Sequence, residues 1–247
     1  MLRISGLSHR YPNGMLALCD VDLDVRPGEL LVVLGGNGCG KTTLLRCITR
    51  ALAPTTGRVW LNDSPISQLA GEKLRRARLD LAMISQQANL VRRRSVLANV
   101  ACGTLGRHRS WWTALGRLPR HELAAAHGHL RQVGLAHLAT RRAGTLSGGQ
   151  AQRAAIARAL AQRPLAMLAD EPVASLDPEA AEDIMRLLRR LAHDDGLAVL
   201  CVLHQVELAF SYADRVVGMR DGRVAFDRDR AELSRDTVQR LYLAAAA

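Results

Sequence analysis

The sequence contains few aromatic residues and no apolar run long enough to cross a membrane. Phenylalanine, tryptophan and tyrosine make up 3% of the 247 residues, too few for the base-stacking platforms of single-strand-binding proteins. The longest apolar stretches, residues 96–105 and 197–203, fall short of the roughly 20 residues that a transmembrane helix needs. The first residues also lack the apolar core of a signal peptide. We therefore expect a soluble chain that is made and kept in the cytosol.

Paired cysteines are also absent. The five cysteines are scattered along the chain, and no two of them form a C-x-x-C pair. An odd number of cysteines without metal-ligand spacing favours reduced thiols. Four histidines, at positions 121, 127, 129 and 137, likewise have no spacing that builds a tetrahedral metal site.

Lysine is scarce although the chain is basic. Lys41 and Lys73 are the only lysines, and arginine supplies most of the formal net charge of +11. Residues 86–142 contain ten arginines and a single acid, Glu122. This stretch is either a solvated helical surface or a face that meets an acidic partner, a membrane surface or nucleic acid.

One of the two lysines lies in the most informative stretch, residues 35–42, which read GGNGCGKT. This G-x-x-x-x-G-K-[ST] pattern follows a predicted strand at 30–34 and precedes a predicted helix at 42–52, as in the phosphate-binding loop of a nucleoside triphosphatase. Glycines allow backbone N–H groups to surround phosphate oxygens, and the helix adds the positive end of its dipole. Lys41 is predicted to reach the terminal phosphates, and the Thr42 hydroxyl to ligate magnesium.

The order of the predicted elements indicates an α/β fold. Apolar strands are expected at 58–62, 82–85, 165–169 and 197–203, and a hairpin at 215–226 around Asp221 and Gly222. Predicted helices alternate with them, at 69–78, 95–103, 121–133, 150–162, 179–193 and 206–213. This alternation predicts a mainly parallel sheet with helices on both faces, preceded by N-terminal antiparallel strands. We expect a single domain, 1–247, in which residues 1–86 and 162–247 form the core and 87–161 an inserted helical subdomain.

Polar side chains follow three of the predicted strands. Asp170 and Glu171 end one strand, His204 ends another, and Gln86 follows a third. Ligands of such sheets bind beyond the carboxyl ends of the strands. Asp170 is therefore predicted to help hold magnesium, Glu171 to polarise the attacking water, and His204 to contact the γ-phosphate. Gln86 is predicted to make a second contact with that water and with magnesium.

A second anion-binding helix start follows at Ser147, Gly148, Gly149 and Gln150. A serine hydroxyl, backbone N–H groups and a helix dipole are offered there to an anion. A single ATP does not need two such helix ends. We therefore predict that two copies of the chain hold two nucleotides between them, each pocket combining the loop of one copy with the 147–150 turn of the other.

These motifs, in this order, resemble those of the ATP-binding subunit of an ABC transporter. The resemblance rests on GGNGCGKT, LSGGQ, LAMLADEP, the SLD of residues 175–177 and His204, and it extends from Tyr11 to about residue 226. It implies the ABC ATPase fold and ATP hydrolysis coupled to transport, with ATP and Mg²⁺ as cofactors. It also implies a second copy and permease subunits as partners, a solute-binding protein as an indirect partner, and a place at the cytoplasmic face of the inner membrane.

The resemblance also implies roles for individual residues. Tyr11 would stack on adenine, Gln86 would link nucleotide and permease, and Asp177 would belong to the segment that couples the two sites. The phosphates would be wrapped by the loop residues Gly35, Gly36, Asn37, Gly38, Cys39, Gly40, Lys41, Thr42 and Thr43. The arginine-rich stretch lies where this family meets the membrane subunit, so we hypothesise that its charge helps docking.

Within the family, the sequence is most similar to the ATP-binding subunits of phosphonate importers. The similarity rests on residues 86–119, including Trp111 and Trp112, on the Val173–Ala174 pair and on residues 203–227. It favours phosphonates or related phosphorus compounds as the solute. Import of another solute, or an accessory ATPase beside a phosphonate-cleaving complex, stays open. A soluble ABC ATPase acting on nucleic acid or ribosomes is disfavoured, because the chain has one phosphate loop and no heptad run. We therefore expect no nucleic acid as a partner.

Overall fold

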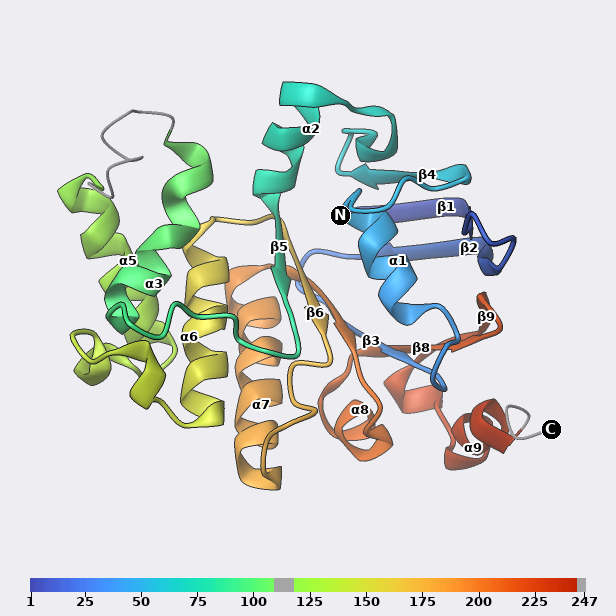
Figure 1. Ribbon diagram of the computed structural model, residues 1–247. Coiled ribbons are helices and arrows are strands. Elements are labelled where there is room, and N and C mark those ends of the chain that lie inside the picture. Colours follow the sequence, from blue (N-terminus) through green and yellow to red (C-terminus); the bar gives the residue numbers. More distant parts are fainter. Residues whose placement is uncertain (109–117, 244–247) are drawn as a thin grey trace.

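The computed structural model describes residues 1–108 and 118–243 (Figure 1). Trp111, Trp112 and the last four alanines lie outside the described residues. The predicted α/β fold is confirmed: a mostly parallel sheet is flanked by helices, and the N-terminal strands form a small antiparallel sheet. Among the described residues no helix is both long enough and apolar enough to cross a membrane.

The large sheet has six strands in the order β5-β6-β7-β3-β8-β9. Its strands are β3 (Leu30–Leu34), β5 (Leu81–Ile84), β6 (Ala166–Asp170), β7 (Ala198–Val202), β8 (Arg215–Arg220) and β9 (Arg223–Asp229). All neighbours pair in parallel except β8 and β9, which form the predicted hairpin. Every residue of β3 and of β7 is buried, as expected for central strands with helices on both faces.

Helices α3 (Val96–Ala101), α5 (Arg120–Gln132) and α6 (Gly148–Ala161) pack against one another beside the sheet (Figure 1). They are not a separate core, because Val100, Leu130 and Ile156 belong to the same buried cluster as the strand residues Val32 and Val199. The cluster also includes α7 (Pro178–Asp195), α8 (Val206–Tyr212) and α9 (Arg235–Leu243). Movement of the three-helix group therefore affects a core that it shares with the sheet.

Helix α7 shows how its sequence fixes its ends. The Asp177 carboxylate accepts the Ala180 N–H at 2.9 Å, and Pro178 occupies the first turn, where its missing N–H costs nothing. Gly196 ends the helix in a left-handed conformation, with φ of 66°. Asp177 thus has a structural task in its own chain.

The small sheet consists of β1 (Leu2–Arg10), β2 (Leu16–Val25) and β4 (Thr56–Leu61), in the order β2-β1-β4. Helix α1 (Lys41–Ile48) contacts β1 and β2 on one side and β6 on the other, and its apolar face closes a second buried cluster. The short helix α2 (Gly71–Ala77) precedes β5.

Arg215 joins the two sheets through a buried ion-pair network. Its guanidinium donates to Asp227 at 2.6 Å, to Glu29 at 2.9 Å and to Asp24 at 3.3 Å. The hydrogen bonds to Asp227 and Glu29 raise the pKa of Arg215, although burial lowers it. Because Asp24 lies on β2 and Asp227 on β9, the network fixes the small sheet against the edge of the large one.

The structure corrects the ends of two predicted helices. The helix expected to reach residue 52 ends at Ile48, and the Thr49 hydroxyl then donates to the Leu45 carbonyl at 3.0 Å. Arg50 follows with a positive φ of 59°, which ends the helical path. The helix expected at 95–103 ends at Ala101, and the chain continues as a tighter turn over Cys102–Arg107.

Candidate functional site

The three segments that carry most of the predicted chemistry follow neighbouring strands. β6, β7 and β3 lie side by side in parallel, so their carboxyl ends share one edge of the sheet. A cavity of about 290 Å³ opens at this edge. Its lining consists of Tyr11, Met15, Ala17, Asn37, Gly38, Gly40, Lys41, Thr42, Thr43, Glu171 and His204.

The loop between β3 and α1 holds Lys41 in place through its own carbonyl groups. The residue Lys41 is 5% exposed, and its ammonium group donates to the Gly35 carbonyl at 2.7 Å and to the Gly36 carbonyl at 2.9 Å. Gly40, which caps α1, has φ of 107°, and a side chain there would collide with the Ala17 carbonyl oxygen, 2.5 Å from an added Cβ. The positive end of α1 thus borders the cavity and favours an anion there.

Glu171 and His204 meet across the ends of β6 and β7. Their side chains approach to 2.6 Å, between Glu171 Oε1 and His204 Nε2, and both line the cavity. Glu171 has a positive φ of 50°, unusual for a residue with a side chain, and its N–H donates to the Val202 carbonyl. This arrangement suits a base that is oriented by a second group.

Asp170 is half-buried beside Glu171 but is not among the residues that line the cavity. Burial and the neighbouring Glu171 raise the pKa of Asp170, whereas Arg46 and Lys41 lower it. Thr42 lines the cavity, and Asp170 directly precedes Glu171, which lines it too. Hydroxyl and carboxylate oxygens are ligands that hard cations such as Mg²⁺ prefer, so the residue types at this edge of the sheet fit that ion.

Tyr11 reaches the cavity from the small sheet. Its hydroxyl lies 3.1 Å from the Thr43 hydroxyl, and its ring packs edge-on against His9 at a centroid distance of 4.7 Å. Met15 and Ala17 line the same side of the cavity. Sequence reasoning missed these two residues, and only their closeness to the turn after Tyr11 could have indicated them.

The 147–150 turn lies elsewhere. Ser147 Oγ accepts the Gln150 N–H at 3.3 Å, and Gln150 Oε1 accepts the Ser147 N–H at 3.1 Å, which makes a capping box at the start of α6. Ser147 and Gly148 are exposed, and none of the four residues lines the cavity of its own chain. Gln86 and Asp177 are also exposed and outside that lining. The cavity therefore contains only part of the predicted site.

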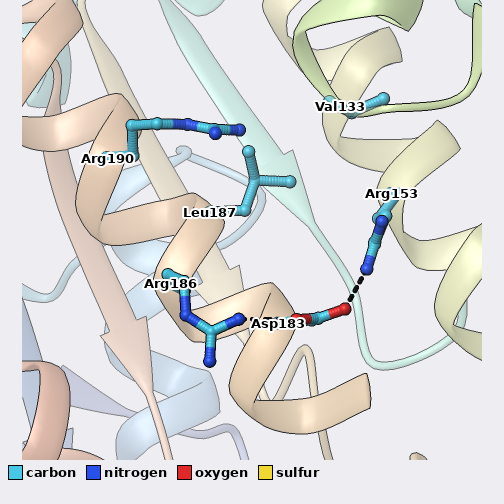
Figure 2. A pocket seen from close by; sticks show the side chains of 6 residues that line it. All are labelled: Val133, Arg153, Asp183, Arg186, Leu187 and Arg190. Atoms are coloured by element: carbon cyan, nitrogen blue, oxygen red, sulfur yellow. Dashed lines mark hydrogen bonds and ion pairs between the residues drawn. The ribbon is translucent and has the colours of Figure 1, made fainter. Parts of the chain in front are cut away.

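A smaller cavity of about 160 Å³ lies where α6 meets α7 (Figure 2). Arg153 of α6 and Asp183 of α7 face each other across it as an ion pair, and Asp183 also accepts from Arg186 at 2.7 Å. None of its lining residues belongs to the predicted site. The Asp183 carboxylate is shared by the guanidinium groups of Arg153 and Arg186. We therefore interpret this cavity as a packing junction between α6 and α7.

Two of the histidines in the arginine-rich stretch do come together. His108, His121 and Glu122 have possible ligand atoms within 4.8 Å of one another. Glu122, however, accepts two hydrogen bonds of 3.0 Å from Arg163. The guanidinium cation occupies the carboxylate that a metal ion would need, so this group is a poor fit for a cation.

This chain is similar to known proteins over nearly its whole length. A profile of the family described as ABC transporter matches residues 18–174. The phosphonates import ATP-binding protein PhnC of Thiobacillus denitrificans is 48% identical over 242 residues, which cover 98% of this chain and 92% of that protein. Its namesake from Bdellovibrio bacteriovorus is 44% identical over 243 residues, covering 98% and 93%. Among solved structures, the dimeric post-hydrolysis ATP-binding cassette MJ0796 with ADP and Pi superposes with a TM-score of 0.80 and 31% identity, covering 93% of this chain and 99% of that one.

Replacing Asp170 with asparagine should raise the free energy of unfolding at neutral pH, because a neutral amide avoids both desolvation and repulsion by Glu171. A raised pKa means that the folded chain binds this proton more tightly than the unfolded chain, so the carboxylate destabilises the fold above its folded pKa. The gain should therefore shrink as the pH falls through that raised value towards 3.8, the ordinary value. Urea unfolding over a pH series measures this difference in the free energy of unfolding between the variant and the wild type.

The matched control is Asp63→Asn, at an exposed position outside the cavity, which should change little at any pH. A D170N variant that is less stable than the wild type across the whole series would contradict the assigned electrostatics.

Proposed function

This chain belongs to the ABC transporter family of ATP-binding subunits, and from that premise we propose that it is the ATP-hydrolysing motor of an importer for phosphonates or related phosphorus compounds. The chain binds ATP, as its family does. The observation that carries the proposal is the cavity in which Lys41, Thr42, Glu171 and His204 converge. The phosphonate assignment is supported by the names of relatives that are 44–48% identical over nearly the whole chain.

The loop residues 35–43 would hold the phosphates in this proposal. Lys41 would exchange its contacts with the Gly35 and Gly36 carbonyls for phosphate oxygens, so its buried charge stays satisfied in both states. The N–H groups at the start of α1 add donors that cost no reorganisation. Tyr11, on the small-sheet side of the cavity, would stack on the adenine ring.

Thr42 and Asp170 would hold Mg²⁺, and Gln86 would join them when its exposed loop approaches the nucleotide. When bound, the ion neutralises charge on the β- and γ-phosphates. Glu171 would orient and polarise the attacking water, and His204, already within 2.6 Å of Glu171, would hold that carboxylate and contact the γ-phosphate.

The site is completed by a second copy of the chain. The start of α6 is preformed and lies outside the cavity of its own chain; it consists of Ser147, Gly148, Gly149 and Gln150. Asp177 is exposed and lies outside that cavity as well. We propose that they contact the nucleotide held by the partner copy. The dimeric cassette MJ0796, with its ADP and Pi, supports this arrangement.

The permease would dock on the group of helices that we assign to a helical subdomain, residues 87–161. Two side chains of α6 hold the loop after β5: Gln152 donates to the Ser85 carbonyl at 3.1 Å, and Arg158 donates to the carbonyls of Ala88 and Asn89 at 2.9 and 2.8 Å. A groove of about 330 Å³ opens beside this loop. A nucleotide-driven shift of α6 would therefore move the groove that faces the permease.

Arg92 lines this groove, and further arginines lie next to it in the chain. The exposed arginines at 92–94 and 141–142 lie side by side, because Ser95 pairs with Arg142 and the Ala143 N–H donates to the Arg94 carbonyl. We propose that this basic patch binds the membrane subunits or anionic lipid at the cytoplasmic face of the inner membrane.

Changing Glu171 to glutamine should reduce the rate of ATP hydrolysis about a hundredfold or more, which abolishes useful turnover, because the amide cannot polarise water. ATP binding should persist. ATP hydrolysis and binding of a fluorescent ATP analogue measure the two effects, and sedimentation should show an ATP-dependent dimer. Glu232→Gln, at an exposed glutamate outside the cavity, is the control. Normal hydrolysis by E171Q would refute Glu171 as the base.

Growth of the source organism on a phosphonate as sole phosphorus source should require this chain, because import of the solute depends on ATP hydrolysis. Uptake of a radiolabelled phosphonate into cells should be lost in a deletion strain, restored by the wild type and not restored by E171Q. Growth on inorganic phosphate is the control. Normal uptake with failed growth would instead indicate an accessory role in phosphonate cleavage, and unaffected growth would indicate another solute.

Replacing Arg92, Arg93 and Arg94 with glutamine should weaken association with membrane vesicles that contain the permease. Raising the salt from ~0.05 to ~0.5 M should weaken the wild type in the same way, because salt screens exposed charges. Co-sedimentation with the vesicles measures both effects. The control changes Arg235 and Arg240, two exposed arginines on α9 that are paired with acids. Salt-independent binding would end the electrostatic docking hypothesis.

A further inference from the structure

The phosphate loop is held from outside the cavity by the turn between β8 and β9. The Gly222 N–H donates to the Cys39 carbonyl at 3.0 Å, and the Gly222 carbonyl accepts the Cys19 N–H at 2.9 Å. Gly222 therefore bridges the loop and β2, although it lies far from both in sequence. Figure 1 shows β8 beside β3, the strand that leads into the loop.

The first of these hydrogen bonds fixes the orientation of a peptide unit at the edge of the cavity. The Cys39 carbonyl and the Gly40 N–H belong to the same peptide unit, and in a planar trans peptide the two groups point in opposite directions. Because the carbonyl points to Gly222, the Gly40 N–H points to the opposite side, and Gly40 lines the nucleotide cavity. A rotated peptide would present a carbonyl oxygen to the phosphate and repel it.

The packing around Gly222 leaves no room for a side chain. Gly222 has φ of 75°, and an added Cβ would lie 2.8 Å from the Ala17 carbonyl oxygen and 3.1 Å from the Leu18 Cα. These are backbone atoms of β2, so the turn itself would have to move away. Gly40 packs against Gly222 from the phosphate loop: a Cβ added to Gly40 would be 3.5 Å from the Gly222 Cα.

We propose that Gly222 is a positioning residue for nucleotide binding, which holds the Cys39–Gly40 peptide with its N–H towards the phosphates. This inference rests on the proposed function, because it takes the cavity to be the ATP site. Gly222 lies beyond residues 18–174, the part of the chain that the family profile matches.

The test compares Gly222→Ala with Gly196→Ala. Gly196, at the end of α7, also has a positive φ, 66°, but an added Cβ there meets nothing within 4 Å. Both variants carry a similar backbone strain and should unfold at a lower temperature. Only G222A should weaken binding of a fluorescent ATP analogue, by about tenfold for one displaced donor. In ATPase assays G222A should raise KM for ATP more than it lowers kcat.

The outcomes separate this inference from the proposed function. A wild type that binds no ATP would defeat the proposed function itself. Wild-type affinity in G222A, or an equal loss in both variants, would overturn the role of Gly222 alone.

Hydrogen exchange of the wild type decides the question if G222A does not fold. ATP should slow exchange of the Gly222 amide, because bound ATP would hold the Cys39–Gly40 peptide, whose carbonyl accepts the hydrogen bond of that amide. The Gly196 amide, which donates to the Leu191 carbonyl, should be unaffected. An unchanged Gly222 amide would overturn the inference.

Discussion

The parallel pairing of β6, β7 and β3 is the constraint on which the rest of the structure depends. Parallel strands present their carboxyl ends at one edge, so the residues that follow each strand meet there whatever their distance in sequence. Lys41, Glu171 and His204 share a cavity for this reason. The helices on both faces bury the same strands. Arg215 fixes the small sheet, and Tyr11 follows the last residue of β1 in that sheet.

The sequence predicted those parts of the site that depend on local order along the chain. Continuous apolar runs identified β3, β6 and β7, and the glycine-rich loop identified the phosphate end of the cavity. Met15, Ala17 and the contact of Gly222 with Cys39 could not be found in this way, because they depend on how distant turns pack. The early end of α1 was missed because it depends on the hydroxyl of Thr49 and the backbone of Arg50. The roles given to Gln86, Asp177 and the 147–150 turn stay predictions, since these residues lie outside the cavity of a single chain.

Helix α6 connects the parts of the site that a single chain leaves apart. It begins at the exposed Ser147, contacts α7 through Arg153 and Asp183, and holds the loop after β5 through Gln152 and Arg158. A rigid helix cannot shift at one end alone. In the proposed dimer, contact of Ser147 with the partner's nucleotide would therefore also reposition the groove beside Arg92.

The scarcity of lysine has a consequence for the chemistry of this protein. Lys73 is exposed on α2, whereas Lys41 is buried with its ammonium bound to two carbonyls. Acylating reagents attack only amines that are accessible and unprotonated, so of the two lysines only Lys73 is a ready target. Reagents that modify lysine side chains therefore have a single accessible target here, and the fold shields the amine at the phosphate site.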